Sequence, residues 1–369
     1  MIVEGDCDTR ADMACRDQDT QLAPHSLPHL VLETVPSRRI PFIRLPHETT
    51  RTNYVSFCKS IDFLFSVITY GVSSLFVSML QRIIMTKFFF DYPTLICIAQ
   101  MAATSLALEL LKLFKLLSIQ PYTFERAKEM FLPSFLYTFS AYISMNAIEG
   151  ISMPMFVPIE CFCPLAILLF TSFVLRRSFP STSFLCTIFI ICLGSSTANV
   201  FQFEWERWSY LFGVAALVMQ AASFVMIENL SQHYSALDLL YVNSFHSLAL
   251  FLFADFFEDE IRDAVMFCLT NASVTFVIVF AVVVLLGILV QLSSFYCISY
   301  ASSLVLAVTA DVRSSLQVFI SYLFSVYAFY DIIPGVSNAI GLLMTLGASI
   351  VLFRVNIQQL HKTSSILNC

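Results

Sequence analysis

Residues 303–329 read SLVLAVTADVRSSLQVFISYLFSVYAF, an apolar stretch long enough to cross a bilayer. Two charged residues, Asp311 and Arg313, lie near its middle. Each mid-span charge costs roughly 2.5–3.5 kcal/mol, whereas each of about a dozen Leu, Val, Ile and Phe residues contributes roughly 0.3–0.6 kcal/mol, so insertion is barely favourable. Residues two apart on a helix point to nearly opposite sides. Asp311 and Arg313 therefore cannot neutralise each other, and each requires its own partner, water or ligand.

The composition of the whole chain is that of a polytopic membrane protein. Of its 369 residues, 58% are hydrophobic and only 12% are charged, and the mean hydropathy is +0.78. The 11 cysteines are scattered, and most lie inside expected spans, so we interpret them as small buried hydrophobes. No nucleophile and base stand together in any loop. For this reason we do not expect an enzyme. We also expect no nucleic-acid partner, no metal site and no cofactor.

Ten apolar stretches, counted at about twenty residues per crossing, are expected to be transmembrane helices. They centre on residues 61–80, 93–112, 130–147, 153–175, 182–200, 209–227, 238–254, 273–295, 303–329 and 335–353. The predicted fold class is therefore an all-α integral membrane protein with about ten transmembrane helices. The longest connection, the acidic stretch Phe256–Asn271, is expected to be a solvated loop.

The segment before the first span has mixed charges, five prolines between Pro24 and Pro46, and no apolar run of signal-peptide length. We interpret residues 1–60 as a disordered N-terminal tail without a cleavable signal peptide. An even number of spans places both termini on one side, and basic residues favour the cytosolic side. In this count the terminal side carries Arg51, Lys59, Lys115, Arg126, Lys128, Arg176, Arg177, Arg354 and Lys362. Both termini, including a short tail at 354–369, are therefore expected in the cytosol.

A weak internal repeat divides the ten spans into two groups of five, residues 61–200 and 201–353. Ser152–Pro180 and Ser303–Pro334 correspond, because each opens with a small residue, carries a charge about eight residues later, and continues as a long apolar helix. Five spans is an odd number, so the two halves must insert with opposite orientation. This is the inverted-repeat plan of secondary transporters, which places the substrate near the midplane between the halves.

Five motifs together indicate a family more specifically by their order and spacing than any one of them does alone. They are Gln81-Arg82 with Thr86 and Tyr92-Pro93, Ile98–Thr104 (IAQMAAT), Met153–Phe156 (MPMF), Leu239–Asn243 (LLYVN) and Ala310–Ser314 (ADVRS). In order and spacing they resemble motifs of the nucleotide-sugar transporters of the drug/metabolite transporter superfamily, in particular the subgroup for UDP-glucuronic acid and UDP-N-acetylgalactosamine. The resemblance covers nearly all of residues 60–353. It implies a nucleotide-sugar/nucleoside monophosphate antiporter of the endoplasmic reticulum or Golgi membrane.

The chain departs from that subgroup by exchanging cations for carboxylates. Glu160-Cys161 stands where the subgroup has two basic residues, Glu149-Gly150 replaces a basic pair, and Glu228 replaces a Lys. Asp311 replaces a small residue. A diphosphate carries about two negative charges, which in a dry cavity require cations or helix N-termini. These departures therefore bear on which solute the chain carries.

The intramembrane charges and the resemblance together give eight candidate solute-binding residues. They are Arg313, Ser314, Tyr241, Asn243, Asp311, Glu160, Gln100 and Arg82. Arg313 would bind phosphate oxygens through its guanidinium, or would be a structural partner of Glu160. Asp311 and Glu160 would be proton or cation sites, or clamps between the halves. Tyr241 and Asn243 occupy the place of the family's nucleotide signature, with an interhelical hydrogen bond as the alternative, and Gln100 has the same alternative.

Three functions remain open on the sequence. The first is UDP-sugar/nucleoside monophosphate antiport by alternating access, with a homodimer as a candidate assembly. The second keeps the fold and moves a less anionic solute with proton coupling, because Glu160 and Asp311 add negative charge to the site. The third is a non-transporting membrane scaffold or trafficking protein that uses its long N-terminal tail for partners.

Overall fold

The computed structural model describes residues 54–117, 119–149, 155–174, 180–200, 207–271, 273–324 and 334–366. All regular elements in these ranges are helices, so the predicted all-α fold class is confirmed. They are α1 (Tyr54–Phe88), α2 (Pro93–Leu113), α3 (Phe124–Glu149), α4 (Phe156–Glu160), α5 (Cys163–Val174), α6 (Thr182–Asn199), α7 (Arg207–Leu230), α8 (Ala236–Glu258), α9 (Glu260–Asn271), α10 (Val274–Tyr300), α11 (Ser303–Leu323) and α12 (Val336–Ile366).

Nine helical segments of the described chain are long and apolar enough to cross a membrane. They coincide with nine of the ten expected spans. The remaining span, 130–147, lies inside α3, a helix of 26 residues whose first turns carry Glu125, Arg126, Lys128 and Glu129. Residues 1–53 of the expected disordered tail at 1–60 lie outside the described residues, as does the last part of the expected ninth span. Residues 54–60 are not disordered, because α1 begins at Tyr54.

Three expectations about helix boundaries are corrected. The acidic stretch Phe256–Asn271 is not a loop, because the end of α8 and the whole of α9 occupy it. The expected helix 153–175 is broken at Cys161–Phe162, where α4 ends and α5 begins. The last helix does not stop at residue 353 but continues to Ile366, through most of the expected C-terminal tail.

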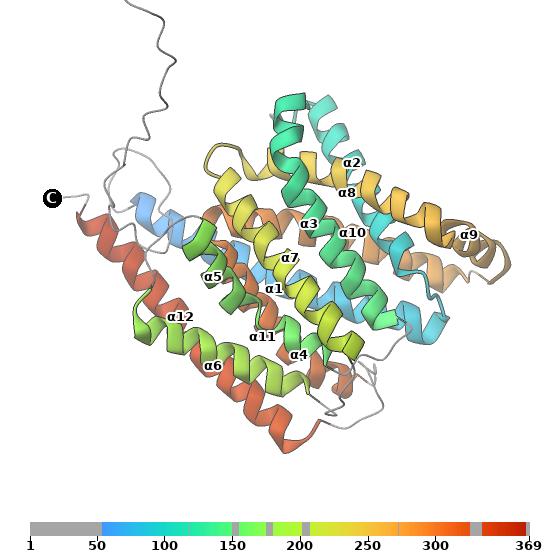
Figure 1. Ribbon diagram of the computed structural model, residues 1–369. Helices are drawn as coiled ribbons and strands as arrows, with labels where there is room; N and C mark the ends of the chain where they lie inside the picture. Colours follow the sequence, from blue (N-terminus) through green and yellow to red (C-terminus); the bar gives the residue numbers. More distant parts are fainter. Residues whose placement is uncertain are drawn as a thin grey trace, which may run out of the picture. The chain divides into compact units, whose positions relative to one another are not determined.

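The closest helix pairs each join a helix of the first predicted half to one of the second. These pairs are α6 with α12, α1 with α10, α3 with α7, and α2 with α8. Figure 1 shows α6 and α12 running side by side. Helix α11 contacts α1, α5 and α6 from one half and α7, α10 and α12 from the other. A residue on α11 therefore lies next to helices of both predicted halves. The inverted orientation of the two halves stays a prediction.

The α6–α12 pair is packed backbone against backbone through glycines. A Cβ atom placed on Gly341 would lie 2.5 Å from the backbone nitrogen of Ala198, and one on Gly194 would lie 2.9 Å from that of Thr345. The Asn338 amide nitrogen donates to the carbonyl oxygens of Ala198 and Val200, both at 2.9 Å. Small residues that let helix backbones approach are the usual basis of helix association in lipid, where no hydrophobic driving force exists between helices.

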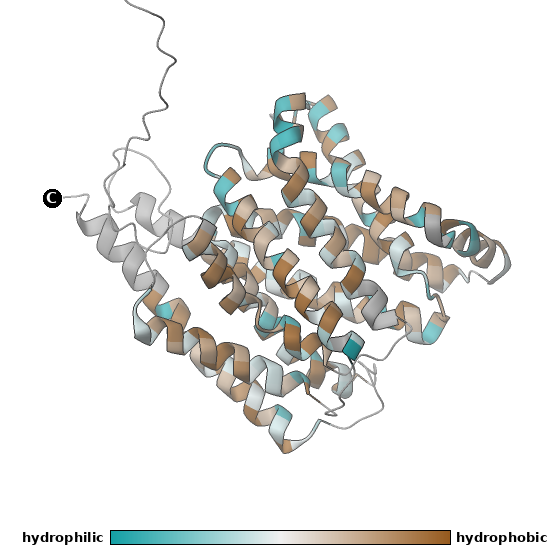
Figure 2. Ribbon diagram, viewed as in Figure 1, coloured by the Kyte–Doolittle hydropathy of each residue, from teal (hydrophilic) through white to brown (hydrophobic). Residues whose placement is uncertain are grey.

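The exposed surface of the helices is strongly apolar. Large side chains such as Phe65, Phe173 and Leu285 are 70%, 77% and 65% exposed. Figure 2 shows hydrophobic residues along the helices and hydrophilic ones more often near helix ends. A continuous apolar surface of this kind would be unfavourable in water, but it is what a bilayer requires.

Candidate functional site

A cavity of about 360 Å³ lies between the helices, within the size range of small-ligand sites. Helices α1, α3, α4, α7, α10 and α11 supply most of its wall. Four of its lining residues are charged, and all four are candidates from the sequence: Arg82, Glu160, Asp311 and Arg313. Because both predicted halves contribute to the wall, the cavity is placed where relative movement of the halves would reshape it.

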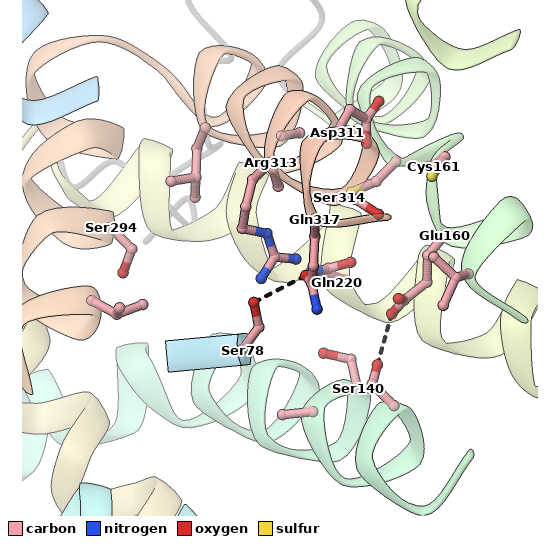
Figure 3. A pocket seen from close by; sticks show the side chains of 18 of the residues that line it. Ser78, Ser140, Glu160, Cys161, Gln220, Ser294, Asp311, Arg313, Ser314 and Gln317 are labelled. Atoms are coloured by element: carbon pink, nitrogen blue, oxygen red, sulfur yellow. Dashed lines mark hydrogen bonds between the residues drawn. The ribbon is translucent and has the colours of Figure 1, made fainter. Parts of the chain in front are cut away.

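Arg313 extends its side chain from α11 into the cavity (Figure 3). Its Nε atom is buried and has no hydrogen-bond partner in the part of the chain that the structure describes. Figure 3 shows the guanidinium close to Gln317, Gln220 and Ser78, all neutral polar residues. A guanidinium presents five N–H donors in a planar fork that matches the oxygens of phosphate. Arg313 is therefore available to an anionic ligand.

Glu160 ends α4 at the helix break and also faces the cavity. One carboxylate oxygen accepts a 2.7 Å hydrogen bond from the Ser144 hydroxyl of α3. Among the described residues no ion pair joins Glu160 to Arg313, although both line the cavity. The described partner of the Glu160 carboxylate is thus a neutral hydroxyl and not Arg313.

Asp311 lies on a different side of α11 from Arg313, as two-residue spacing predicts (Figure 3). Its side chain is nearly buried, at 4% exposed, and its Oδ2 atom has no hydrogen-bond partner in the described chain. The hydroxyls of Ser195 and Ser315 donate to its backbone carbonyl, at 3.2 and 2.9 Å, and not to its carboxyl group. The backbone of α11 is thus held firmly at Asp311, while the carboxyl group lacks a donor at one oxygen.

Arg82 lines the cavity from α1, six residues before that helix ends at Phe88. Arg313 lines the same cavity. Ser314 also lines the cavity, and its hydroxyl donates to the Asn199 Oδ1 atom at 3.0 Å. The side-chain nitrogen of Asn199 donates in turn to the Ser195 carbonyl at 2.8 Å. Ser314 therefore joins α11 to α6 in this structure.

Three of the eight candidates do not line the cavity: Gln100, Tyr241 and Asn243. Gln100 donates to the Val283 carbonyl at 3.3 Å and packs against Gly287 of α10. Asn243 is completely buried, and neither atom of its amide has a partner among the described residues. All three lie in helix interfaces, and their role in solute binding stays a prediction.

Tyr241 lies between α8 and α2. Its hydroxyl donates to the Glu109 carboxylate and accepts from the Lys112 Nζ atom at 3.3 Å, and this ammonium lies 4.8 Å from the ring centroid. The Tyr241 hydroxyl is thus part of an interhelical polar cluster in this structure.

Several polar lining residues were missed by the sequence reasoning. The Ser78 hydroxyl donates to the Gln317 Oε1 atom at 2.9 Å across the α1–α11 contact, and Gln220, Ser294 and Asn199 also reach the wall. Only Gln317 carried a signal, because it is four residues after Arg313 and so on the same face of α11. Isolated serines and amides in apolar helices give no such signal.

The chain is similar to curated transporter proteins at low sequence identity. It is 24% identical over 206 residues to the "Putative UDP-sugar transporter DDB_G0278631" of Dictyostelium discoideum, and this match spans 55% of the chain and 54% of that relative. It is 19% identical over 244 residues to the "UDP-galactose/UDP-glucose transporter 7" of Arabidopsis thaliana, across 65% of the chain and 75% of the relative. The match to the human "Nucleotide sugar transporter SLC35D2" is 23% identical, across 68% and 74%.

The fold is similar to that of a solved structure. A solved structure titled "Crystal structure of protein" superposes with a TM-score of 0.56 at 12% identity, over 80% of this chain and 98% of that one. No family model matches the chain. The chain spans about half the length of the Dictyostelium relative and about three quarters of the other two. The resemblance to nucleotide-sugar transporters is confirmed by these relatives, at 19–24% sequence identity.

Proposed function

We propose that this chain is a secondary transporter that exchanges a nucleotide sugar, a UDP-sugar in the first place, for a nucleoside monophosphate by alternating access. The observation that carries the proposal is the Arg313 guanidinium, which extends into the cavity between the two predicted halves with its Nε atom free of any described partner. The names of the relatives supply the solute class. An intramembrane cation facing a cavity is by default part of a solute pathway.

The lining of the cavity fits the parts of a nucleotide. Arg313 would hold the phosphates in a charge-assisted bidentate contact, with Arg82 as the second cation of the wall. Tyr70, Tyr137 and Phe224 offer aromatic surface for the base on the wall itself. In this arrangement the aromatic residues of the cavity, rather than Tyr241, contact the nucleoside.

The membrane placement follows the same proposal. The two five-helix halves would rock against each other around the cavity, with both termini in the cytosol and the protein in the Golgi or endoplasmic reticulum membrane. A homodimer stays a prediction, because the described contacts concern one chain. Neither the halves nor the cavity requires a second copy.

The test is exchange by the purified full-length protein in liposomes. Liposomes preloaded with UMP should accumulate a labelled UDP-sugar faster than unloaded ones, because an antiporter returns to the outside only with a counter-solute. Protein-free liposomes loaded with UMP give the background. Uptake at that background across a panel of nucleotide sugars would overturn the proposal.

The charges of the wall favour a second candidate, a solute less anionic than a UDP-sugar. Two arginines, Arg82 and Arg313, face two carboxyl groups, Glu160 and Asp311, so the lining is formally neutral when all four are charged. A dianion gains less from such a wall than from an excess of cations. Competition by a nucleoside and by nucleotides of one, two and three phosphates separates the candidates, since a preference for the neutral nucleoside would favour the second.

A further inference from the structure

Asp311 is a buried carboxyl group on the helix that contacts both halves. The residue is 4% exposed and forms part of the cavity wall, yet its Oδ2 atom has no hydrogen-bond partner in the described chain. The described ion pairs do not include Asp311. A carboxylate in such a setting is stabilised by binding a proton or a cation, because an unpaired buried charge is strongly unfavourable.

The groups around Asp311 do not supply a neutralising contact. The charged residues that act on it are Arg313, which extends from another side of α11, and Glu160 of α4, which carries like charge. The helices packed against this level of α11 present neutral titratable groups. These are Tyr70 of α1, Cys161 and Cys163 at the α4–α5 break, Cys192 of α6, and Cys297 of α10 beside Tyr70.

The remaining contacting helices carry their charges elsewhere. Glu228, near the end of α7, is bonded to Ser303 at the start of α11, and Arg354 of α12 is exposed. Arg82 of α1 also lines the cavity, so the charged groups of the described wall around Asp311 are Arg82, Glu160 and Arg313.

We propose that Asp311 is a proton-binding site whose occupancy is coupled to the binding of an anionic solute at Arg313. The inference rests on the proposed function, because it names the ion that accompanies the proposed solute. A proton fits better than a metal or alkali cation. The described residues contain no group of three His, Cys, Asp or Glu side chains that could hold a metal ion. The neighbours of Asp311 are thiols and hydroxyls already engaged, not a shell of oxygen ligands.

The coupling follows from the spacing of the two residues on one helix. An ionised Asp311 partly cancels the field of Arg313, and it also repels an anion in the cavity. A proton on Asp311 removes both effects, so the proton and the anion each strengthen the binding of the other, and by the same factor. The proton comes from the solvent on one side of the membrane and returns to solvent on the other, with no bond broken in the solute.

This coupling fixes the direction in which solute binding depends on pH. Solute binding should tighten as pH falls and weaken as pH rises through the range in which Asp311 of the empty cavity ionises. Coupling of one proton to one solute makes the apparent Kd rise by up to about tenfold per pH unit there, and the total change should be roughly 5- to 150-fold.

The first experiment measures binding of a UDP-sugar to purified full-length protein from mildly acidic to mildly alkaline pH. UMP is not used, because a phosphate monoester has a second pKa of about 6 and would itself titrate in this range. Wild type should bind less tightly as pH rises, whereas Asp311→Asn, which has no ionisable group there, should bind with a nearly constant Kd. Asp311→Glu should keep a slope. Glu160→Gln, also in the wall, is the matched control and should keep the slope whatever its effect on affinity.

Contrary outcomes are distinct. A flat wild-type profile, or a slope that persists in Asp311→Asn, would overturn the assignment while leaving UMP exchange intact. Stimulation by sodium at fixed pH in place of protons would overturn it in favour of an alkali cation. Equally, exchange that fails on every nucleotide sugar would remove the proposed function without deciding the proton site.

A second measurement does not need the solute. Infrared difference spectra of the protein between two pH values should contain the carbonyl stretching band of a protonated carboxylic acid. That band should be absent in Asp311→Asn and present in Glu160→Gln, in samples shown by their melting curves to be folded. Spectra in which Asp311→Asn retains the whole band would overturn the proposal, whatever the transport assays show.

Discussion

The Glu228 carboxylate accepts hydrogen bonds from both the backbone N–H, at 3.0 Å, and the hydroxyl of Ser303, the first residue of α11. Glu228 is 3% exposed and lies near the end of α7. A carboxylate at a helix N-terminus is stabilised by the unpaired N–H groups and by the helix dipole. The first turn of α11 is thereby held to α7, outside the cavity wall, which on α11 starts at Leu306.

Replacing this carboxylate should destabilise the fold. Glu228→Gln keeps the shape but loses the charge-assisted bonds to Ser303, so we expect a loss of about 1–3 kcal/mol. Melting of the purified protein, followed by tryptophan or dye fluorescence, measures it. Glu129→Gln is the matched control, because Glu129 bonds Tyr234 at an exposed site and should contribute about 0–1 kcal/mol. Equal melting temperatures for the two variants would contradict the prediction.

The α6–α12 contact should not tolerate a methyl group at Gly341. The new Cβ atom would lie 2.5 Å from the backbone nitrogen of Ala198 and 2.6 Å from the Gly194 carbonyl oxygen, so Gly341→Ala must push the helices apart. The expected cost is about 1–3 kcal/mol. Gly347→Ala on the same helix meets no atom within 4 Å and should be neutral or slightly stabilising. Equal melting temperatures for Gly341→Ala and Gly347→Ala would show that α6 and α12 do not pack this closely at Gly341.

The helices could be predicted because apolar length is a direct consequence of bilayer thickness. The errors have local causes. The acidic residues of Phe256–Asn271 predict a loop, although Ala264 and Phe267 of α9, three residues apart, belong to an apolar cluster with Phe90, which follows α1, and Phe276 of α10. The break at Cys161–Phe162 had a signal in Pro164, which donates no backbone hydrogen bond and favours the first turn of a new helix.

The charged residues of the candidate cavity could be predicted from the sequence. Arg82, Glu160, Asp311 and Arg313 all face the cavity, because a charge in a span is costly unless it meets a cavity or a polar partner such as the Ser303 that bonds Glu228. Tyr241, Asn243 and Gln100 carry no such cost and can be buried against a neighbouring helix as readily as against a cavity. In helices that are apolar on every side, the sequence does not show which face meets the cavity.

Tyr241 and Tyr137 distinguish the nucleotide position implied by the resemblance from the one implied by the cavity. Tyr241→Phe removes a hydroxyl bonded to Glu109 and Lys112 outside the cavity, so we expect about 1 kcal/mol less stability and an unchanged Kd for UMP. Tyr137→Ala removes a ring from the wall itself and should weaken UMP binding by roughly tenfold. Calorimetric titration of both folded variants with UMP decides between the two positions. Weaker binding by Tyr241→Phe alone would place the nucleoside at α8 instead.

Arg313 should be sensitive to a change that keeps its charge. Arg313→Lys leaves one cation in the cavity but replaces the planar fork by a point charge, so UMP affinity should fall by about tenfold or more, and Arg313→Ala should lose it further. Neither change removes a described hydrogen bond of the Nε atom, so the melting temperature of the solute-free protein should not fall.

Arg262→Ala is the matched control for the two Arg313 variants. Its side chain is 69% exposed and pairs with Asp259 and Asp263, far along the sequence from the cavity residues. A Lys variant with full UMP affinity would show that the site needs only positive charge. An Ala variant with full affinity, at unchanged pH, would remove Arg313 from the solute pathway, and the second candidate solute would then be favoured.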